Sequence, residues 1–219
     1  SKEDFYTADD YFNDGESEYE AENFANAIVL FNKATEMGSS QNIYDELVLC
    51  YQELGQFEIA LEMLNKYNAE AENEKYVNTV WALNTLGYIK RKLKDYASSI
   101  KVAEEFINSY KINPDALDYS LDTKFIEDNF ENCKANYFNY FMSLKDSASY
   151  EKAIDVQNKW LKIIKILEYD KTYEAITYYR LAEVKKLTKD NYGAIQDVNE
   201  YIKTWPEDRW GFKLRGEIK

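Results

Sequence analysis

Residues 57–61 read Phe57-Glu58-Ile59-Ala60-Leu61, and this short phrase decides the fold because it recurs along the chain. Each copy has an aromatic residue, two variable residues, a small residue and then Ile or Leu, and a fifth copy at 192–195 is one residue short. Consecutive small residues are 33, 39, 54 and 41 positions apart. The small residues of the five copies are Ala27, Ala60, Ser99, Ala153 and Ala194.

A mostly apolar stripe follows each small residue, at the positions four and seven residues later. Steps of three and four put these positions on one face of a helix. A second amphipathic segment with the same steps precedes each phrase, so we predict that every unit is a helical hairpin. The small residues lie where two helix axes must approach closely. The stripe residues are Phe31 and Ala34, Leu64 and Tyr67, Ala103 and Phe106, Gln157 and Trp160, and Val198 and Tyr201.

This pattern resembles the tetratricopeptide repeat family, whose 34-residue unit is a helical hairpin. Pro206 lies 12 residues after Ala194, where the family often has its proline, and Gly216 lies 34 residues after Ala182. The resemblance implies an all-α fold, an α-solenoid of stacked antiparallel hairpins that wind into a right-handed superhelix.

We predict a single solenoid domain over residues 1–219, with an insertion at 111–122. Asp14 and Glu18 fall where the family has large apolar residues, so the first helix is expected to be irregular or shifted by one residue. A long helix is expected over 123–146. The predicted repeats are 5–38, 41–72, 74–110, 123–168, 171–205 and the start of a sixth at 207–219.

The sixth repeat consists of a lone helix in this sequence. No second helix follows to cover its apolar side, which includes Trp210, Phe212 and Leu214. Terminal repeats of a solenoid need a polar cap for solubility. We therefore expect that the parent protein continues, or that this helix is the cap, or that it packs on a neighbouring molecule.

Composition argues against catalysis. The 219 residues contain no histidine, two cysteines and seven glycines, which excludes histidine-based triads and metal sites, a disulfide framework and a glycine-rich phosphate loop. Cys50 and Cys133 are expected to be small buried residues. We predict no enzyme activity, no cofactor and no metal. Turnover that is lost on mutation of Cys50 would revive an enzymatic role.

The charge is acidic and uneven. The formal net charge is −13, which argues against nucleic-acid binding, and residues 1–75 carry 18 acids but only 4 bases. The simpler interpretation of this acidic third is a solvent-exposed surface that keeps the protein in solution. The more specific interpretation is that its charge attracts a basic partner. No apolar run is long enough to span a membrane. The cytoplasm is the simplest expectation, and the periplasm or secretion stays open if a signal was removed.

The family resemblance implies a groove lined by the first helix of each hairpin. In the fourth repeat the positions are Ala135, Phe138, Met142 and Lys145, and in the fifth they are Ile176, Tyr179, Glu183 and Lys186. Trp81, Asn84, Tyr88 and Arg91 share one helix face, although aromatic residues at helical spacing are more often core and Arg91 with Tyr88 also fits a surface cation–π pair. The candidate binding residues are Trp81, Asn84, Tyr88, Arg91, Phe138, Tyr179, Asp45 and Gln52.

The predicted function is a non-catalytic interaction module or scaffold that binds a peptide or helix of a partner protein in this groove. Two alternatives stay open. The array is a structural solenoid that self-associates through its open sixth-repeat helix, or it is a regulatory or sensor segment of a larger multidomain protein.

Overall fold

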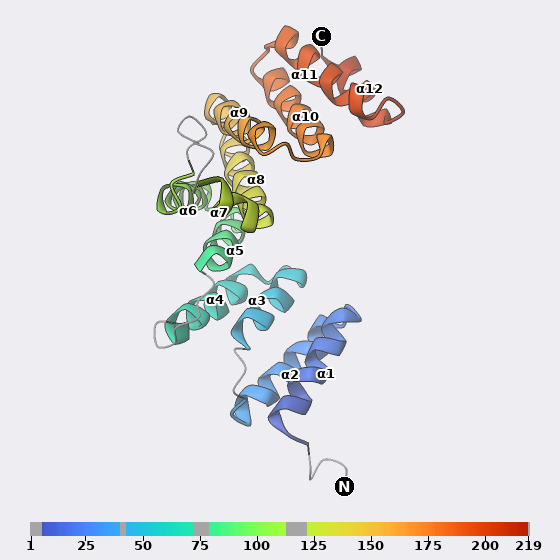
Figure 1. The fold of residues 1–219 in the computed structure, drawn as a ribbon. Helices are drawn as coiled ribbons and strands as arrows, with labels where there is room; N and C mark the ends of the chain where they lie inside the picture. The colour runs from blue at the N-terminus through green and yellow to red at the C-terminus, as the bar shows by residue number, and fades with distance from the viewer. Residues whose placement is uncertain (1–5, 40–42, 72–78, 113–121, 219) are drawn as a thin grey trace. The chain divides into compact units, whose positions relative to one another are not determined.

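Short helices joined by tight turns make up nearly all of the described chain in the computed structural model (Figure 1). The structure describes residues 6–39, 43–71, 79–112 and 122–218, and within these ranges it contains no strand. The helices are α1 (Ala8–Glu20), α2 (Phe24–Glu36), α3 (Tyr44–Glu53), α4 (Phe57–Ala71), α5 (Thr79–Lys92), α6 (Tyr96–Ser109), α7 (Asp122–Asp128), α8 (Phe130–Asp146), α9 (Tyr150–Ile166), α10 (Lys171–Leu187), α11 (Asn191–Thr204) and α12 (Arg209–Glu217).

The turns between paired helices follow one pattern. A residue just past the first helix adopts a positive φ, as Gly55 does at +70° and Lys189 at +63°. The next backbone N–H then bonds back to a carbonyl in the last helical turn, and a capping residue starts the second helix. Asp190, for example, follows Lys189, and its carboxylate accepts a hydrogen bond from the backbone N–H of Gly193 at 3.0 Å.

The helices belong to two compact units, Ser1–Leu93 and Lys94–Lys219. The first unit contains α1 to α5 and the second contains α6 to α12, so the two helices of the predicted repeat 74–110 lie in different units. The single-domain arrangement over 1–219 stays a prediction. Most of the predicted insertion, at 113–121, lies outside the described residues.

The first unit has its core between α2, α3, α4 and α5. Phe31 of α2, Leu47 of α3 and Leu64 of α4 are completely or almost completely buried there. In α1 the buried residue is Gly15, one position after Asp14, and a Cβ atom on Gly15 would lie 2.7 Å from the Phe31 ring. The first helix is continuous from Ala8 to Glu20, and glycine lets it approach α2 closely.

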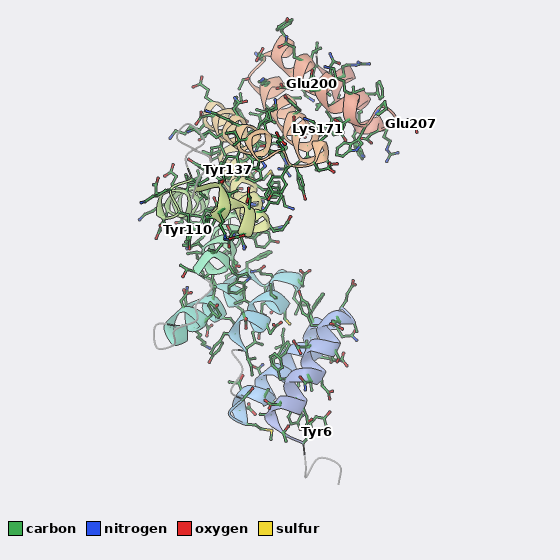
Figure 2. All side chains as sticks on the ribbon, in the orientation of Figure 1. Tyr6, Tyr110, Tyr137, Lys171, Glu200 and Glu207 are labelled. Atoms are coloured by element: carbon green, nitrogen blue, oxygen red, sulfur yellow. The ribbon has the colours of Figure 1, made fainter. Side chains whose placement is uncertain are left out.

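The second unit is built around the aromatic core of α8 and α9. Tyr137 of α8 is buried and stacks on Trp160 of α9 with 5.1 Å between ring centroids (Figure 2 labels Tyr137). Ser99 of α6 and Ser143 of α8 share a buried hydrogen bond of 2.8 Å between their Oγ atoms. The five small residues of the sequence phrase, Ala27, Ala60, Ser99, Ala153 and Ala194, are all fully buried, as their spacing predicts.

The prediction of one long helix over 123–146 is wrong, because the segment forms two helices, α7 and α8. The break falls at Asn129, whose side-chain Nδ2 donates a hydrogen bond to the carbonyl of Phe125 at 3.0 Å. Asparagine competes for backbone groups in this way, which favours a helix boundary over a helix interior.

Helix α12 also differs from the prediction. Leu214 was expected to be uncovered, but it is only 5% exposed and packs with Val198 of α11. Gly211 faces Tyr201 and Ile202 of α11, whereas Gly216 has nothing near it. The contact thus uses Gly211 and Leu214, and not Gly216, which lies 34 residues after Ala182. Trp210 and Phe212 remain 46% and 43% exposed, as expected.

Candidate functional site

A cavity of about 280 Å³ lies between α8, α10 and the end of α11 in the second unit. Its lining combines aromatic and aliphatic side chains with three charged ones, a composition typical of ligand-binding hollows. The lining residues are Phe138, Phe141, Met142 and Lys145 of α8, Ile176, Tyr179, Arg180 and Glu183 of α10, Tyr201 of α11, and Trp205, which follows α11.

A second cavity, of about 340 Å³, lies between α8, α10 and α12. The two cavities share Lys145, Tyr179 and Glu183, so they adjoin, and we call them together the α8–α10–α12 groove. An extended peptide segment needs an elongated surface of this kind. The second cavity is lined by Lys145, Tyr179, Glu183, Lys186, Leu187, Trp210, Lys213, Leu214 and Glu217.

One wall of the groove is aromatic. The rings of Tyr179 and Tyr201 are 5.0 Å apart, and Tyr201 meets Trp205 edge-on at 5.1 Å. The Tyr201 hydroxyl donates a hydrogen bond to the carboxylate of Asp208. Burial is the main cause that raises the pKa of Tyr179 and of Tyr201, with further contributions from nearby acids. Both side chains therefore stay neutral and keep a hydroxyl proton to donate.

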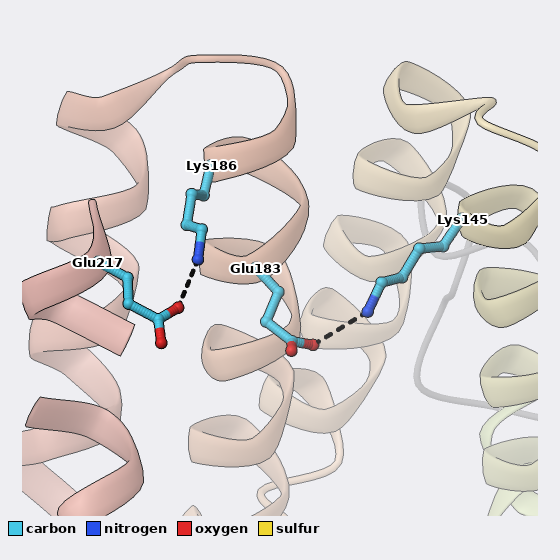
Figure 3. A network of polar contacts seen from close by, with 4 residues as sticks. All are labelled: Lys145, Glu183, Lys186 and Glu217. Atoms are coloured by element: carbon cyan, nitrogen blue, oxygen red, sulfur yellow. Dashed lines mark hydrogen bonds and ion pairs between the residues drawn. The ribbon is translucent and has the colours of Figure 1, made fainter. Parts of the chain in front are cut away.

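Two ion pairs join the first helices of neighbouring repeats along the groove (Figure 3). Lys145 Nζ of α8 lies 3.3 Å from the Glu183 carboxylate of α10, and Lys186 Nζ of α10 lies 2.6 Å from the Glu217 carboxylate of α12. Glu183 and Glu217 are 34 residues apart, one repeat length. Partly exposed pairs of this kind add about 0.2–1 kcal/mol each. Their clearer consequence is that four of the groove's charges neutralise one another.

Arg180 is one of the three charged residues that line the first cavity, with Lys145 and Glu183. Its guanidinium carbon lies 4.5 Å from the centroid of the Phe138 ring on α8. Burial lowers the pKa of Arg180, and the opposing effect of Glu183 is smaller. The guanidinium stays charged at neutral pH, because its ordinary pKa is far above 7.

Phe138 and Tyr179 are the two predicted binding residues that the structure brings together in this groove. The sequence analysis missed Arg180 and Trp205. Arg180 falls between the groove positions of its own helix, so periodicity within α10 gives no signal for it. Only the packing of α10 on α8 places it over Phe138.

The predicted residues on α5 lie in the first unit and contact α4. The ring centroids of Trp81 and Tyr67 are 5.0 Å apart in an edge-on contact, and those of Tyr88 and Phe57 are 6.0 Å apart. Part of the surface of Trp81 and of Tyr88 is therefore covered by α4 within the unit. The Arg91 guanidinium carbon lies 5.6 Å from the Tyr88 centroid, which is the surface cation–π pair that the spacing also allowed.

The remaining predicted residues also lie in the first unit. Asn84 is only 7% exposed. Asp45 and Gln52 are half-buried on α3, and the side-chain Nε2 of Gln52 has no hydrogen-bond partner among the described residues. Burial raises the pKa of Asp45.

The described residues hold no arrangement that suggests catalysis. Within them, no group of three or more Cys, Asp or Glu side chains is placed to bind a metal ion. Cys50 and Cys133 are buried, as expected, and burial raises the pKa of each thiol to about 12. A thiol with so high a pKa carries almost no thiolate at neutral pH. No described helix is both long and apolar enough to cross a membrane.

Comparison with known proteins gives matches only at the level of structure. No protein-family model and no curated protein sequence matches this chain. MamA (residues 41 to the end) from Desulfovibrio magneticus RS-1 superposes with a TM-score of 0.68 at 12% identity, covering 92% of this chain and 97% of MamA.

Two further solved structures are similar over nearly the whole chain. YrrB, described as a TPR protein with an unusual peptide-binding site, gives a TM-score of 0.61 at 15% identity, with 98% of this chain and 95% of YrrB covered. A tetratricopeptide repeat protein from Parabacteroides merdae gives 0.62 at 18% identity, with 97% of this chain and 71% of that protein covered. The chain therefore has the fold of the tetratricopeptide repeat proteins.

Proposed function

We propose that this chain is a non-catalytic protein-interaction module that binds a peptide segment of a partner protein in the α8–α10–α12 groove. The observation that carries the proposal is that the two cavities adjoin and share three lining residues. Phe138, Tyr179 and Trp210 supply aromatic anchor surface along this path, and aromatic residues dominate binding energy at interfaces.

The similarity to YrrB supports this proposal, because that protein is described as having a peptide-binding site. The two cysteine thiols are buried, the chain has no histidine, and Lys145, Glu183, Lys186 and Glu217 of the groove are held in ion pairs. These residues favour a binding role over a catalytic one.

We extend the proposal to the first unit through its predicted residues. Asp45, Gln52, Trp81, Asn84, Tyr88 and Arg91 would form the corresponding surface on α3 and α5. The acidic first third would speed the association of a basic partner. Binding of a lysine-rich peptide by this unit would then weaken strongly with added salt.

Self-association through α12 is the second candidate function. The half-exposed rings of Trp210 and Phe212 favour it, because large exposed apolar side chains on one short helix suit a contact with another molecule. Light scattering over a range of concentrations tests it. A mass that rises with concentration and returns to the monomer value in Phe212→Glu supports self-association, and a constant monomer mass refutes it.

A selection with random peptides tests groove binding. Twelve-residue peptides displayed with fixed flanks are selected on the wild-type chain, and the selected sequences are made with acetylated N-termini and amidated C-termini. Calorimetry then measures their affinity for wild type, for Phe138→Ala/Tyr179→Ala and for Gln196→Ala, a control at an exposed position of α11.

We expect the double variant to bind at least about tenfold more weakly, since truncating interface anchors typically costs more than 1 kcal/mol each. The control should stay within about twofold of wild type. Circular dichroism confirms that each variant is folded. Equal affinity of wild type and a folded double variant would refute binding in this groove.

A further inference from the structure

The α8–α10–α12 groove contains two cations that take part in no ion pair with a described residue. Its charged side chains are four cations and two anions, and the anions are used by Lys145–Glu183 and Lys186–Glu217. Arg180 and Lys213 are left over, so the groove has a local charge of +2 in a chain whose net charge is −13.

One other hollow of the second unit does not show this imbalance. The depression of about 700 Å³ between α9, α10 and α11 is lined by three lysines and three glutamates. Lys171 pairs there with Glu174, Lys203 pairs with Glu200, and Lys165 donates to the Tyr178 hydroxyl at 2.8 Å. An excess of positive charge is thus a feature of the groove and not of every concave surface in the unit.

Arg180 is the better placed of the two unpaired cations to select a ligand. Its guanidinium carbon lies 4.5 Å from the centroid of the Phe138 ring, and a cation–π contact of this kind does not pair the guanidinium with a carboxylate. The N–H groups of the guanidinium form no ion pair with any described carboxylate. A half-buried cation with unused donors matches the two oxygens of a carboxylate, which bind a guanidinium in parallel hydrogen bonds.

We propose, as an extension of the function proposed above, that Arg180 makes the groove selective for a peptide with an internal glutamate or aspartate. The carboxylate binds the guanidinium side-on, and the neighbouring Tyr179 is available as a further donor. An apolar residue of the same peptide packs on Ile176 and Met142. Lys213, which lies 5.2 Å from the Trp210 centroid, gives a second favourable position for acid nearer α12.

The shape of the groove favours a side-chain carboxylate over a chain terminus. The cavity that is lined by Arg180 adjoins the cavity beside α12, because the two share three lining residues. A peptide that fills both cavities therefore continues beyond Arg180. The acid that meets the guanidinium then belongs to a side chain within the segment.

The test uses the capped 12-residue peptides from the selection, each made with glutamate and with glutamine at the acidic position. Calorimetry measures both forms on wild type, Arg180→Met, Arg180→Lys and Arg215→Met. Arg215 is a matched control, because its guanidinium also lies over a ring, that of Phe212 at 5.1 Å, but it does not line the groove. Thermal unfolding verifies that each variant is folded.

We expect wild type and Arg215→Met to bind the glutamate form at least about tenfold more tightly than the glutamine form. A partly buried, charge-assisted pair gives an affinity difference of about this size. The preference should fall below about twofold in Arg180→Met. Arg180→Lys should keep an intermediate preference, because lysine retains the charge but loses the planar pair of donors.

Three results would overturn the inference. If glutamate and glutamine forms bind wild type equally while Phe138→Ala/Tyr179→Ala still abolishes binding, the groove binds peptides but Arg180 does not select acid. If the amidated peptides do not bind wild type but the same peptides with a free C-terminal carboxylate do, the recognised group is the chain end. If binding ignores the groove variants altogether, the proposed function fails, and this inference fails with it.

Discussion

The guanidinium of Arg180 on α10 lies over the ring of Phe138 on α8, with 4.5 Å between the guanidinium carbon and the ring centroid. A cation and an aromatic residue from two successive hairpins thus line the same cavity. The ring compensates part of the cost of burying the charge, but no carboxylate pairs with it among the described residues. We expect such a residue to lower the stability of the chain, as a binding residue often does.

Arg180→Met should therefore stabilise the protein. The variant keeps a long side chain against Phe138 and removes a charge whose pKa is lowered by burial. We expect the unfolding temperature to rise by about 2–4 °C, the shift that about 1 kcal/mol produces in a chain of this size. Differential scanning calorimetry measures it, with Arg215→Met as the control. A lower unfolding temperature for Arg180→Met than for Arg215→Met would contradict this account of Arg180.

Gly211→Ala should loosen α12 from α11. A Cβ atom at residue 211 would lie 2.7 Å from Ile202 Cγ1 and 2.8 Å from Tyr201 Cδ1, so the helices must separate. Overpacking of this kind costs about 1–3 kcal/mol. Limited proteolysis followed by mass spectrometry detects release of α12. Gly216→Ala, in the same helix but with nothing near it, should leave α12 protected. Equal cleavage of the two variants would contradict the Gly211 contact.

Gln157→Met should raise the free energy of unfolding. Gln157 of α9 is fully buried, and neither polar atom of its side chain has a hydrogen-bond partner among the described residues. A buried amide without partners costs about 1–3 kcal/mol, and methionine has a similar length without that cost. Urea unfolding tests the change, and Gln196→Met at an exposed position should be neutral within about 0.5 kcal/mol. Destabilisation by Gln157→Met would show that the amide has partners.

Alkaline pH should destabilise the chain above pH 9. Burial raises the pKa of Cys50 and Cys133 from 9.0 to about 12, so between these values the folded state holds protons that the unfolded state has lost. The free energy of unfolding is unaffected by the thiols below pH 9. It falls as the pH rises toward 12, by up to about 1.4 kcal/mol per unit for each thiol.

Urea unfolding at pH 8, 9 and 10 measures this slope. In the double variant Cys50→Ala/Cys133→Ala the decline should be shallower, whatever its stability at pH 8. The buried tyrosines, such as Tyr137, whose pKa burial also raises, account for the slope that remains. The same slope in both proteins would show that the two thiols ionise alike in the folded and unfolded states.

Much of the fold could be predicted from local sequence, since each hairpin repeats its own packing signal. Ala60 and Ala153 are buried where the small–large spacing places them. The structure differs from the sequence prediction at two places, and each difference depends on a single residue that hydrophobic periodicity does not identify. Asn129 ends α7 through its side-chain bond to Phe125, and Gly211 provides a closer contact for α12 than Gly216.

The candidate site could be predicted only in part. Phe138 and Tyr179 occupy groove positions of their helices, so helical spacing was enough to find them. Arg180 and Trp205 belong to the site because residues of a neighbouring helix pack beside them. The hydrophobic periodicity of a single helix carries no information about such contacts. The 34-residue interval between Glu183 and Glu217 is one repeat length, so it indicates that the two glutamates occupy equivalent positions. It does not identify their partners, because only the structure places Lys145 beside Glu183 and Lys186 beside Glu217.

A site-specific photocrosslink tests most directly whether the α8–α10–α12 groove binds the peptide. p-Benzoylphenylalanine replaces Phe138 in one protein and Tyr192, an aromatic residue of α11 that is 75% exposed, in another. Each is irradiated with the capped glutamate peptide from the selection. The account predicts a crosslinked product from position 138 and none from position 192. Crosslinking at position 192 with none at position 138 would contradict it.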